Sequence, residues 1–319
     1  MIARRTLLAC LAGACAIIID LEFVEVAETA TAPKRHCPSA VGIHPAAWPA
    51  WHALKPPRAE KSTVDILGTL DSLGYDLERV RKGDGRVPRF LVSNLPQDLR
   101  STDSVDTRKA VFLATLLPAV LLVNEAVLGQ RQLLEGLRIC KRQNIPLSRD
   151  AEIWLGELAQ LYDETPDVDR LMRKVDVVPP SLVLAQAAVE SGWGTSRIAR
   201  EGNALFGEYS YTGAERSRHQ YHLKAFDHVA ESVLSYVRNL NTHPAYERFR
   251  TRRADLRTQG GHPDSHVLAG ELGRYSTRGQ AYVRDIRAMI RTNELGEFDT
   301  SRLSRVELVP RSSAGQLFF

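Results

Sequence analysis

The sequence predicts a mainly α-helical fold, and three observations support this prediction. Apolar residues recur at intervals of three and four along most of the chain after residue 60. The alternation typical of a half-buried strand is rare, and residues 220–226 are the clearest example. With 44% hydrophobic and 25% charged residues among 319, the composition is that of an ordinary globular protein. We therefore expect packed helices with a short β-hairpin.

The N-terminus has the pattern of an export signal. Two arginines precede an apolar run over Leu7–Ile19, and acidic residues follow closely. The best small-residue cleavage site is Ala30–Ala32, so residues 1–32 are expected to be a signal peptide or a retained membrane anchor. A lipoprotein would need Cys10 or Cys15 as the modified residue. Either main alternative predicts a periplasmic or cell-envelope protein, with a tether to the inner membrane if the signal is kept.

The remaining chain divides into a linker, two helical parts and a tail. Residues 33–60 hold six of the 16 prolines, a density that prevents regular structure and predicts a linker. We expect a helical N-terminal region at 61–175 that packs on a catalytic domain at 176–296, followed by a tail at 297–319. Helical spacing predicts these helices: 64–77, 110–123 with a kink at Pro118, 125–141, 151–161, 181–190 and 227–240.

Charge and cysteine content narrow the set of partners. The 42 basic residues exceed the 38 acidic ones by only four and are spread along the chain, which argues against nucleic acid and suits an anionic cell wall. If the signal is removed, Cys37 and Cys140 remain, either as one disulfide or as two free thiols. No close cysteine pair indicates a metal site. We expect no metal or organic cofactor, and the oligomeric state is not predicted.

The helix expected at Ser181–Glu190 carries the chemistry. After Ser181 its only polar side chains are Gln186 and Glu190, which lie four apart and so share one face of a helix that should be buried. Gly192 indicates that the helix ends just after Glu190. Burial and the negative end of the helix dipole should both raise the pKa of this carboxyl group, as a general acid requires. The alternative is a glutamate that faces solvent.

A longer pattern resembles a known family. Glu190-Ser-Gly-Trp-Gly-Thr-Ser-Arg-Ile-Ala-Arg-Glu-Gly-Asn-Ala-Leu-Phe-Gly207 is similar to the signature of glucosaminidases of glycoside hydrolase family 73, the flagellar and autolysin types. Three further stretches look like the Bax-type bacterial branch of these proteins, which are also described as mannosyl-glycoprotein endo-beta-N-acetylglucosaminidase-like. This bacterial branch is unrelated to the animal protein called Bax. These stretches are Leu117–Glu125, Asn239–Tyr246 and Leu272–Tyr282.

The resemblance implies a lysozyme-like helical domain that binds glycan strands of peptidoglycan. It implies that Glu190 is the general acid and that Tyr275 assists the reaction. It also implies that Asn203, Phe206 and Gly207 shape the floor of the cleft. Apart from the resemblance, Trp193 is expected to stack on a sugar ring, and Gln186, on the same helix face as Glu190, is a further candidate for substrate binding. Structural alternatives exist for several of these residues: Phe206 and Tyr275 could only pack in the core, and Asn203 could cap a turn.

The second catalytic carboxylate is where this chain departs from the family pattern. The position at which relatives often carry an acid holds His222 here, which leaves Glu208, Glu215 and Asp227 as candidates. Glu215 is our first choice. If none of these residues reaches the cleft, then unassisted water or the acetamido group of the substrate would have to attack instead.

Two other functions remain open at this point. A non-catalytic peptidoglycan-binding protein would keep the cleft without turnover, and a lytic transglycosylase would share the helical acid but release an anhydro-sugar. The leading prediction is a hydrolase that cuts glycan strands after N-acetylglucosamine, although such proteins are sometimes described as amidases.

Overall fold

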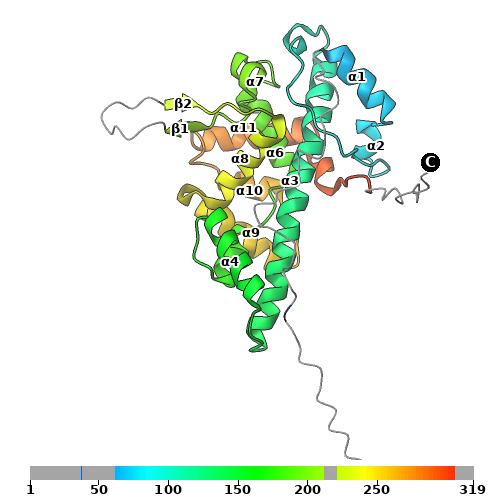
Figure 1. Ribbon diagram of the computed structural model, residues 1–319. Helices are drawn as coiled ribbons and strands as arrows, with labels where there is room; N and C mark the ends of the chain where they lie inside the picture. The colour runs from blue at the N-terminus through cyan, green and yellow to red at the C-terminus, as the bar shows by residue number, and fades with distance from the viewer. Residues whose placement is uncertain (1–36, 38–61, 212–220, 306–319) are drawn as a thin grey trace, which may run out of the picture. The chain divides into compact units, whose positions relative to one another are not determined.

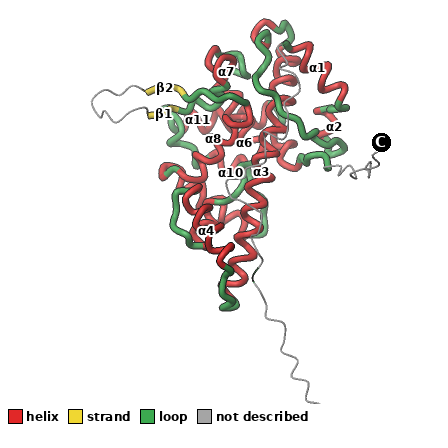
Figure 2. Tube along the Cα trace, in the orientation of Figure 1, coloured by secondary structure: helices red, strands yellow, loops and turns green. Residues whose placement is uncertain are grey.

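The computed structural model describes Cys37, residues 62–211 and residues 221–305, which all lie in one compact unit of the chain. The predicted signal segment and most of the predicted linker lie outside these residues. Helices dominate the described part, so the prediction of a mainly helical fold is confirmed (Figures 1 and 2). The α-helices are α1 Thr63–Ser72, α2 Leu77–Arg81, α3 Val105–Arg142, α4 Arg149–Leu161, α5 Val168–Lys174, α6 Pro180–Ser191, α7 Arg197–Gly202, α8 Val229–Thr242, α9 Glu247–Thr258, α10 Ser265–Ala269 and α11 Gln280–Thr292.

The longest helix, α3, joins two segments that the sequence suggests as separate helices. It runs for 38 residues and contains Pro118, with Ser104 accepting the backbone N–H of Thr107 at its start. The polar Asn124 does not interrupt it, because the Asn124 side chain pairs with both backbone groups of Val178, at 2.8 and 3.3 Å. By length and composition α3 could cross a membrane, but 83% of its apolar window is buried inside the protein. It is therefore a core helix, as predicted, although it is much longer than the 14 residues expected.

The N-terminal helices pack on the rest of the unit. Helix α1 begins with a capping box between Ser62 and Asp65 and packs against α3. Helix α2 contacts the 3₁₀ turn η3, Leu295–Thr300, and Val87 forms a parallel bridge with Leu303. A shorter turn, η1 Leu99–Ser101, precedes α3. Val87 thus belongs to an isolated bridge and not to a strand.

Helix α4 matches its predicted range closely, whereas α5 is absent from the predicted helices. Asp167 caps α5, and the buried residues Val168, Leu171 and Met172 recur at helical spacing. The density of charge around them conceals this pattern in the sequence. Helix α5 packs on α3 and α9, so it is part of the core structure.

Helix α6 lies at the centre of the unit, against α3, α10, α11 and η3. Its first turn is capped by Asp299 of η3, which accepts the backbone N–H and the hydroxyl of Ser181, both at 2.8 Å. Burial raises the pKa of Asp299 to about 6, against the lowering effect of these hydrogen bonds. Phe298 is fully buried. Residues 297–300, at the beginning of the predicted tail, therefore pack onto the helix that carries Glu190.

A two-stranded antiparallel sheet lies beside the helices (Figure 2). Strand β1, Tyr209–Tyr211, pairs with β2, Tyr221–Leu223, and β2 falls within the alternating stretch of the sequence. The segment that links them lies outside the described residues. Helix α8 follows near its predicted position, and the 3₁₀ turn η2, Pro244–Tyr246, joins it to α9.

A buried charge centre joins three parts of the unit. The Asp176 side chain is only 3% exposed and lies within 3.8 Å of Arg131, Arg253 and Arg257, which belong to α3 and α9. Arg253 is fully buried and also donates to the backbone carbonyls of Asp176 and Val177, both at 3.0 Å. Burial lowers the pKa of Arg253 to about 10. This centre fixes the loop before α6 to α3 and α9.

Cys37 and Cys140 form a disulfide, with their Cα atoms 5.8 Å apart. Of the two alternatives left open by the sequence, the structure has the paired form. The bond ties the segment before α1 to the last turn of α3, and it closes a loop with a sequence separation of 103 residues. A loop of this length removes much entropy from the unfolded chain, so the bond should stabilise the fold.

Candidate active site

Glu190 lies in the last turn of α6, as the sequence predicts. Proline at the first helical position starts α6, and Gly192 ends it in the left-handed conformation with φ of 60°. Every α6 residue from Pro180 to Ala188 is buried, whereas Glu190 is half-buried. It forms no salt bridge among the residues that the structure describes. The carboxylate is therefore partly desolvated, and no cation of the described residues pairs with it.

The environment of Glu190 favours its protonated form. Burial raises the pKa of its carboxyl group, while a hydrogen bond from the Tyr282 hydroxyl and the positive charge of Arg278 act in the opposite direction. The net effect is a raised pKa. This direction agrees with the expectation from the sequence, and burial is its largest cause.

A hydrogen-bonded chain of buried side chains supports Glu190 from inside the unit. Tyr236 of α8 donates its hydroxyl to the amide oxygen of Gln186, and the Gln186 amide nitrogen donates to the Tyr282 hydroxyl at 2.8 Å. Tyr282 then donates to Glu190. Gln186 is 0% exposed, and its side chain forms hydrogen bonds with both of these tyrosines. Gln186 is predicted from the sequence to bind substrate. In the structure it is buried and orients Tyr282, whose hydroxyl bonds to Glu190.

The segment from Asn203 to Gly207 ends beside Glu190. A Cβ atom on Gly207 would lie 3.4 Å from Glu190 Oε2, and Gly207 has a φ of 65°, so glycine fits there at little cost. Phe206 is buried and stacks on Tyr236 with ring centroids 4.2 Å apart. The carbonyl of Phe206 accepts the Tyr275 hydroxyl at 2.8 Å. These contacts hold the Gly207 backbone beside the carboxylate.

Asn203 and Tyr275 both hold neighbouring backbone in place. Asn203 is 1% exposed, and its amide donates to the carbonyls of Ser93 and Phe226 at 3.1 and 3.0 Å. Tyr275 stacks on Tyr282 with ring centroids 5.6 Å apart. Burial, followed by nearby tyrosines and acids, raises the pKa of Tyr275, so its hydroxyl stays protonated. In the structure both side chains therefore hold the backbone near Gly207 through hydrogen bonds to main-chain carbonyls.

Trp193 lies just past the end of α6. It adopts a left-handed conformation with φ of 58°, which costs a non-glycine residue about 1 to 2 kcal/mol. Its ring packs edge-on to Phe112, with ring centroids 5.6 Å apart, and Lys109 lies 5.1 Å from its centroid. A Cβ on Gly194 would come within 2.6 Å of Leu95, so glycine is needed for this turn to pack. Trp193 is half-buried and keeps one part exposed.

The candidates for a second carboxylate lie in different places. Glu208 follows Gly207 directly, and its side chain is only 7% exposed. Its Oε2 accepts Lys224 Nζ at 3.1 Å and the Ser235 hydroxyl. Asp227 is exposed at the start of α8. Glu215, our first choice from the sequence, lies outside the described residues. Of the described candidates, Glu208 is nearest to Gly207 in the chain.

Sequence reasoning missed the roles of Tyr236, Tyr282 and Arg278 around the acid. The signal for Tyr282 was present, because it ends one of the family-like stretches, but nothing in the sequence pairs it with Gln186. Among the described residues no group of three or more His, Cys, Asp or Glu side chains could hold a metal ion.

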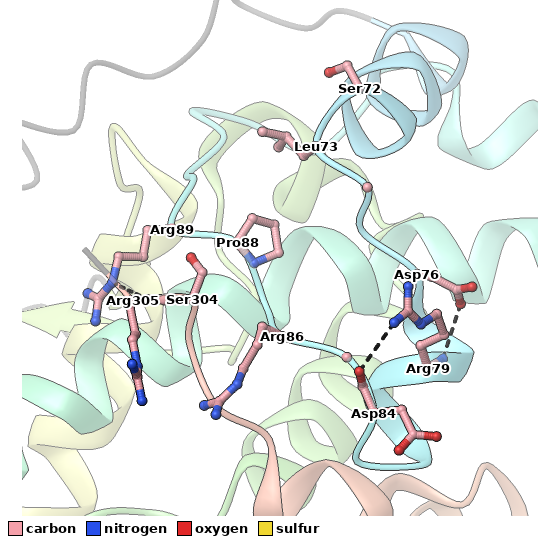
Figure 3. Close-up of a pocket in the computed structure, with 12 residues that line it drawn as sticks. Ser72, Leu73, Asp76, Arg79, Asp84, Arg86, Pro88, Arg89, Ser304 and Arg305 are labelled. Atoms are coloured by element: carbon pink, nitrogen blue, oxygen red, sulfur yellow. Dashed lines mark hydrogen bonds between the residues drawn. The ribbon is translucent and has the colours of Figure 1, made fainter. Parts of the chain in front are cut away.

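A separate hollow of about 800 Å³ lies on another part of the unit (Figure 3). Its lining includes four arginines. One of them, Arg79, donates a hydrogen bond from Nη2 to the backbone carbonyl of Asp84 at 3.5 Å. Arg89 forms a two-point ion pair with Glu125, at 2.9 and 2.6 Å. None of the predicted site residues lines this hollow.

The described site lies within a region of the chain that matches a known family. Residues 165–295 match the glucosaminidase family, described as mannosyl-glycoprotein endo-beta-N-acetylglucosaminidase. This range contains α6, Glu190 and the tyrosines around it. The fold and the site therefore define a helical protein with a glucosaminidase domain.

Protein bax of Escherichia coli (strain K12) is 37% identical over 213 residues, which cover 63% of this chain and 75% of that protein. The chain belongs to the family of this Bax protein. The catalytic domain of the autolysin Auto from Listeria monocytogenes shares 19% identity over 52% of this chain and 97% of that chain, with a TM-score of 0.31. That likeness is too slight to support a conclusion about the fold.

Proposed function

We propose that this protein is an exported glycoside hydrolase, of the family 73 type with a lysozyme-like catalytic domain, that cleaves glycan strands of peptidoglycan as an endo-β-N-acetylglucosaminidase. One observation carries the proposal. Glu190 is a half-buried carboxyl group with a raised pKa and no salt bridge among the described residues, inside the segment that matches the glucosaminidase family. A protonated acid in such a position suits donation to a glycosidic oxygen.

In this proposal Glu190 donates its proton to the oxygen between two sugars as the C1–O bond breaks. Positive charge develops on the ring of the N-acetylglucosamine, and water adds at C1 and releases a proton to solvent or to a base. Tyr282 orients the carboxyl group through its hydrogen bond, and Gln186 orients Tyr282. Tyr275, Asn203 and Phe206 hold the backbone at Gly207, where a sugar would lie against the acid.

Trp193 is proposed to stack on a sugar ring with its exposed part. Glu215 stays a proposal for the second carboxylate. The disulfide between Cys37 and Cys140 supports an oxidising compartment, which suits export to the periplasm through the N-terminal segment.

The test is digestion of purified sacculi by the native protein and by the Glu190→Gln variant. Loss of a general acid should reduce the release of fragments by at least about 100-fold. Mass analysis of the fragments identifies the bond: N-acetylglucosamine at the reducing end supports the proposal, whereas an anhydro-sugar would indicate a lytic transglycosylase. Equal release by both proteins would contradict the role of Glu190, and no release by the native protein would favour a non-catalytic wall-binding protein.

A further inference from the structure

A second hollow lies along the outer face of α8, close to the candidate acid. Its volume is about 420 Å³, and its lining is mainly polar. The lining residues are Lys224, Phe226, Glu231, Leu234, Ser235, Arg238, Asn239 and Thr242. Two of them are cationic and one is acidic, and Glu208, outside the lining, pairs with Lys224, so Arg238 is the cation that forms no ion pair with a described acid.

Both cations are held in place by the protein. Lys224 Nζ donates to Glu208 Oε2 and to Ser235 Oγ, both at 3.1 Å, although its side chain keeps 38% of its surface exposed. Arg238 donates its Nε to the carbonyl of Leu161 at 3.1 Å and forms no salt bridge to a described residue. Its two terminal nitrogens therefore remain available for a ligand. Fixed cations lose less side-chain entropy when they bind an anion.

The one acid in the lining is already engaged. Glu231 accepts the backbone N–H of Asp227 at 3.1 Å, which holds its carboxylate at the first turn of α8. The remaining lining groups include hydroxyls and the Asn239 amide, which can donate hydrogen bonds. The hollow thus offers donors and positive charge, a combination that selects carboxylates over neutral sugars.

Two sets of contacts connect the hollow to the site around Glu190. Glu208 binds Lys224 and Ser235, and it directly follows Gly207, whose Cβ position is 3.4 Å from Glu190 Oε2. Asn239 makes a hydrogen bond to Tyr246, and Tyr246 packs against Tyr275 with ring centroids 6.0 Å apart. A polymer bound over Gly207 could therefore reach the hollow with a side branch.

We propose that this hollow is a subsite for the free carboxylates of the stem peptide that muramic acid carries. The proposal rests on the function proposed above, because it assumes that a peptidoglycan strand lies over Gly207. The sugars of that strand are largely uncharged, whereas the stem peptide is an acidic branch. Arg238 and Lys224 bind its carboxylates, so the protein prefers strands that keep their peptides over stripped strands.

The test compares two soluble probes: glycan strands that carry stem peptides, and the same strands after an amidase has removed the peptides, which leaves one lactyl carboxylate on the backbone of the strand at each muramic acid and none on a branch. Calorimetry gives the affinity for each probe, and product release gives kcat/KM. The native protein should bind the peptide-bearing strands more tightly. Arg238→Gln should weaken that binding by about tenfold, as expected for one charge-assisted hydrogen-bonded contact, and change binding of stripped strands less than about twofold.

Two variants serve as controls. Arg238→Lys keeps the charge and should recover part of the lost affinity, which separates loss of charge from a folding defect. Arg252→Gln removes an arginine from a different hollow, on α9 beside Glu247 and Glu271, and should leave both affinities unchanged.

The outcomes separate this proposal from the proposed function. Equal affinity of the native protein for both probes, or an equal loss on both probes in Arg238→Gln, would overturn the subsite even if the strands are cut. Selective binding of peptide-bearing strands without any cleavage would support the subsite and overturn the hydrolase instead.

Discussion

Two carboxylates in the same unit, Asp176 buried and Glu190 half-buried, have opposite surroundings. Asp176 is 3% exposed and lies among Arg131, Arg253 and Arg257, at 3.6, 3.8 and 2.6 Å. Burial alone would raise the pKa of Asp176, but the arginines outweigh it and hold that pKa below its usual value. Glu190 contacts a phenol hydroxyl instead of a guanidinium, and burial keeps its pKa raised.

This difference separates a structural role from a chemical one. Burying a carboxylate costs free energy, and at Asp176 the cost is offset by charge pairing that also fixes α3 and α9 to the loop before α6. At Glu190 no such ion pair offsets the cost, so burial keeps the pKa of its carboxyl group above the usual value. A carboxyl group whose pKa is shifted by burial, with no ion pair to compensate, is the pattern expected for a reactive group.

Asp176→Asn should have the largest effect on stability. It removes the negative charge and leaves three buried or half-buried arginines without their partner, so we expect a loss of about 3 to 5 kcal/mol in the free energy of unfolding. Urea unfolding followed by circular dichroism measures it. Asp169→Asn is the matched control, because that residue pairs with Arg138 and Lys141 at the surface and should cost at most about 1 kcal/mol. Equal losses of unfolding free energy in Asp176→Asn and Asp169→Asn would show that the buried ion pairs contribute no more than the surface ones.

Asn203→Ala should have a smaller effect on stability. It leaves the half-buried carbonyl of Phe226 without its donor, whereas the Ser93 carbonyl keeps the Val229 N–H at 3.1 Å, and the one such loss costs about 1 to 3 kcal/mol. Activity should fall with it, because Gly207 loses its support beside Glu190. Ser93→Ala keeps the backbone acceptor and should be nearly neutral in the same unfolding experiment. A stable, fully active Asn203→Ala protein would contradict this assignment.

Glu190→Gln should stabilise the protein near neutral pH, whereas Asp176→Asn should destabilise it. A carboxyl group whose pKa is raised on folding contributes most stability below its unfolded value, near 4.3, and that contribution is lost as pH rises through the folded value. The native protein should therefore lose stability relative to the variant from about pH 4 upward. Melting temperatures of both proteins between pH 4 and pH 8 measure the difference. A variant less stable than the native protein at pH 8 would show that the charge is stabilised after all.

The parts of the fold that could be predicted depend on neighbours in the sequence. The apolar run from Ser181, the proline before it and Gly192 after it determine α6 locally, so both the helix and the position of Glu190 were predictable. The long α3 was expected as two helices, because Asn124 resembles an interruption until Val178 supplies its partners.

The surroundings of the acid depend on contacts between distant residues. Gln186 and Tyr282 are 96 residues apart, and no spacing rule brings them together. For the same reason, the burial of Asn203 could not be anticipated, and it was expected to bind substrate. The sequence thus predicts the position of Glu190 at the end of α6, whereas the groups that set its pKa emerge only from packing.

Tyr282→Phe should produce the smallest change and should show how the acid is tuned. The Tyr282 hydroxyl donates to Glu190 and lowers the pKa of that carboxyl group, in opposition to burial. Its removal should raise this pKa further and shift the alkaline limb of the pH–activity profile upward by less than about one unit.

Digestion rates between pH 5 and pH 9 measure this shift. Tyr162→Phe is the control, because Tyr162 is an equally buried tyrosine that donates to Gln130 at 2.6 Å near the Asp176 centre. It should leave the profile in place while lowering stability. A downward shift in Tyr282→Phe would mean that the phenol stabilises the protonated carboxyl group, and the contrast between the two buried acids would then rest on burial and Arg278 alone.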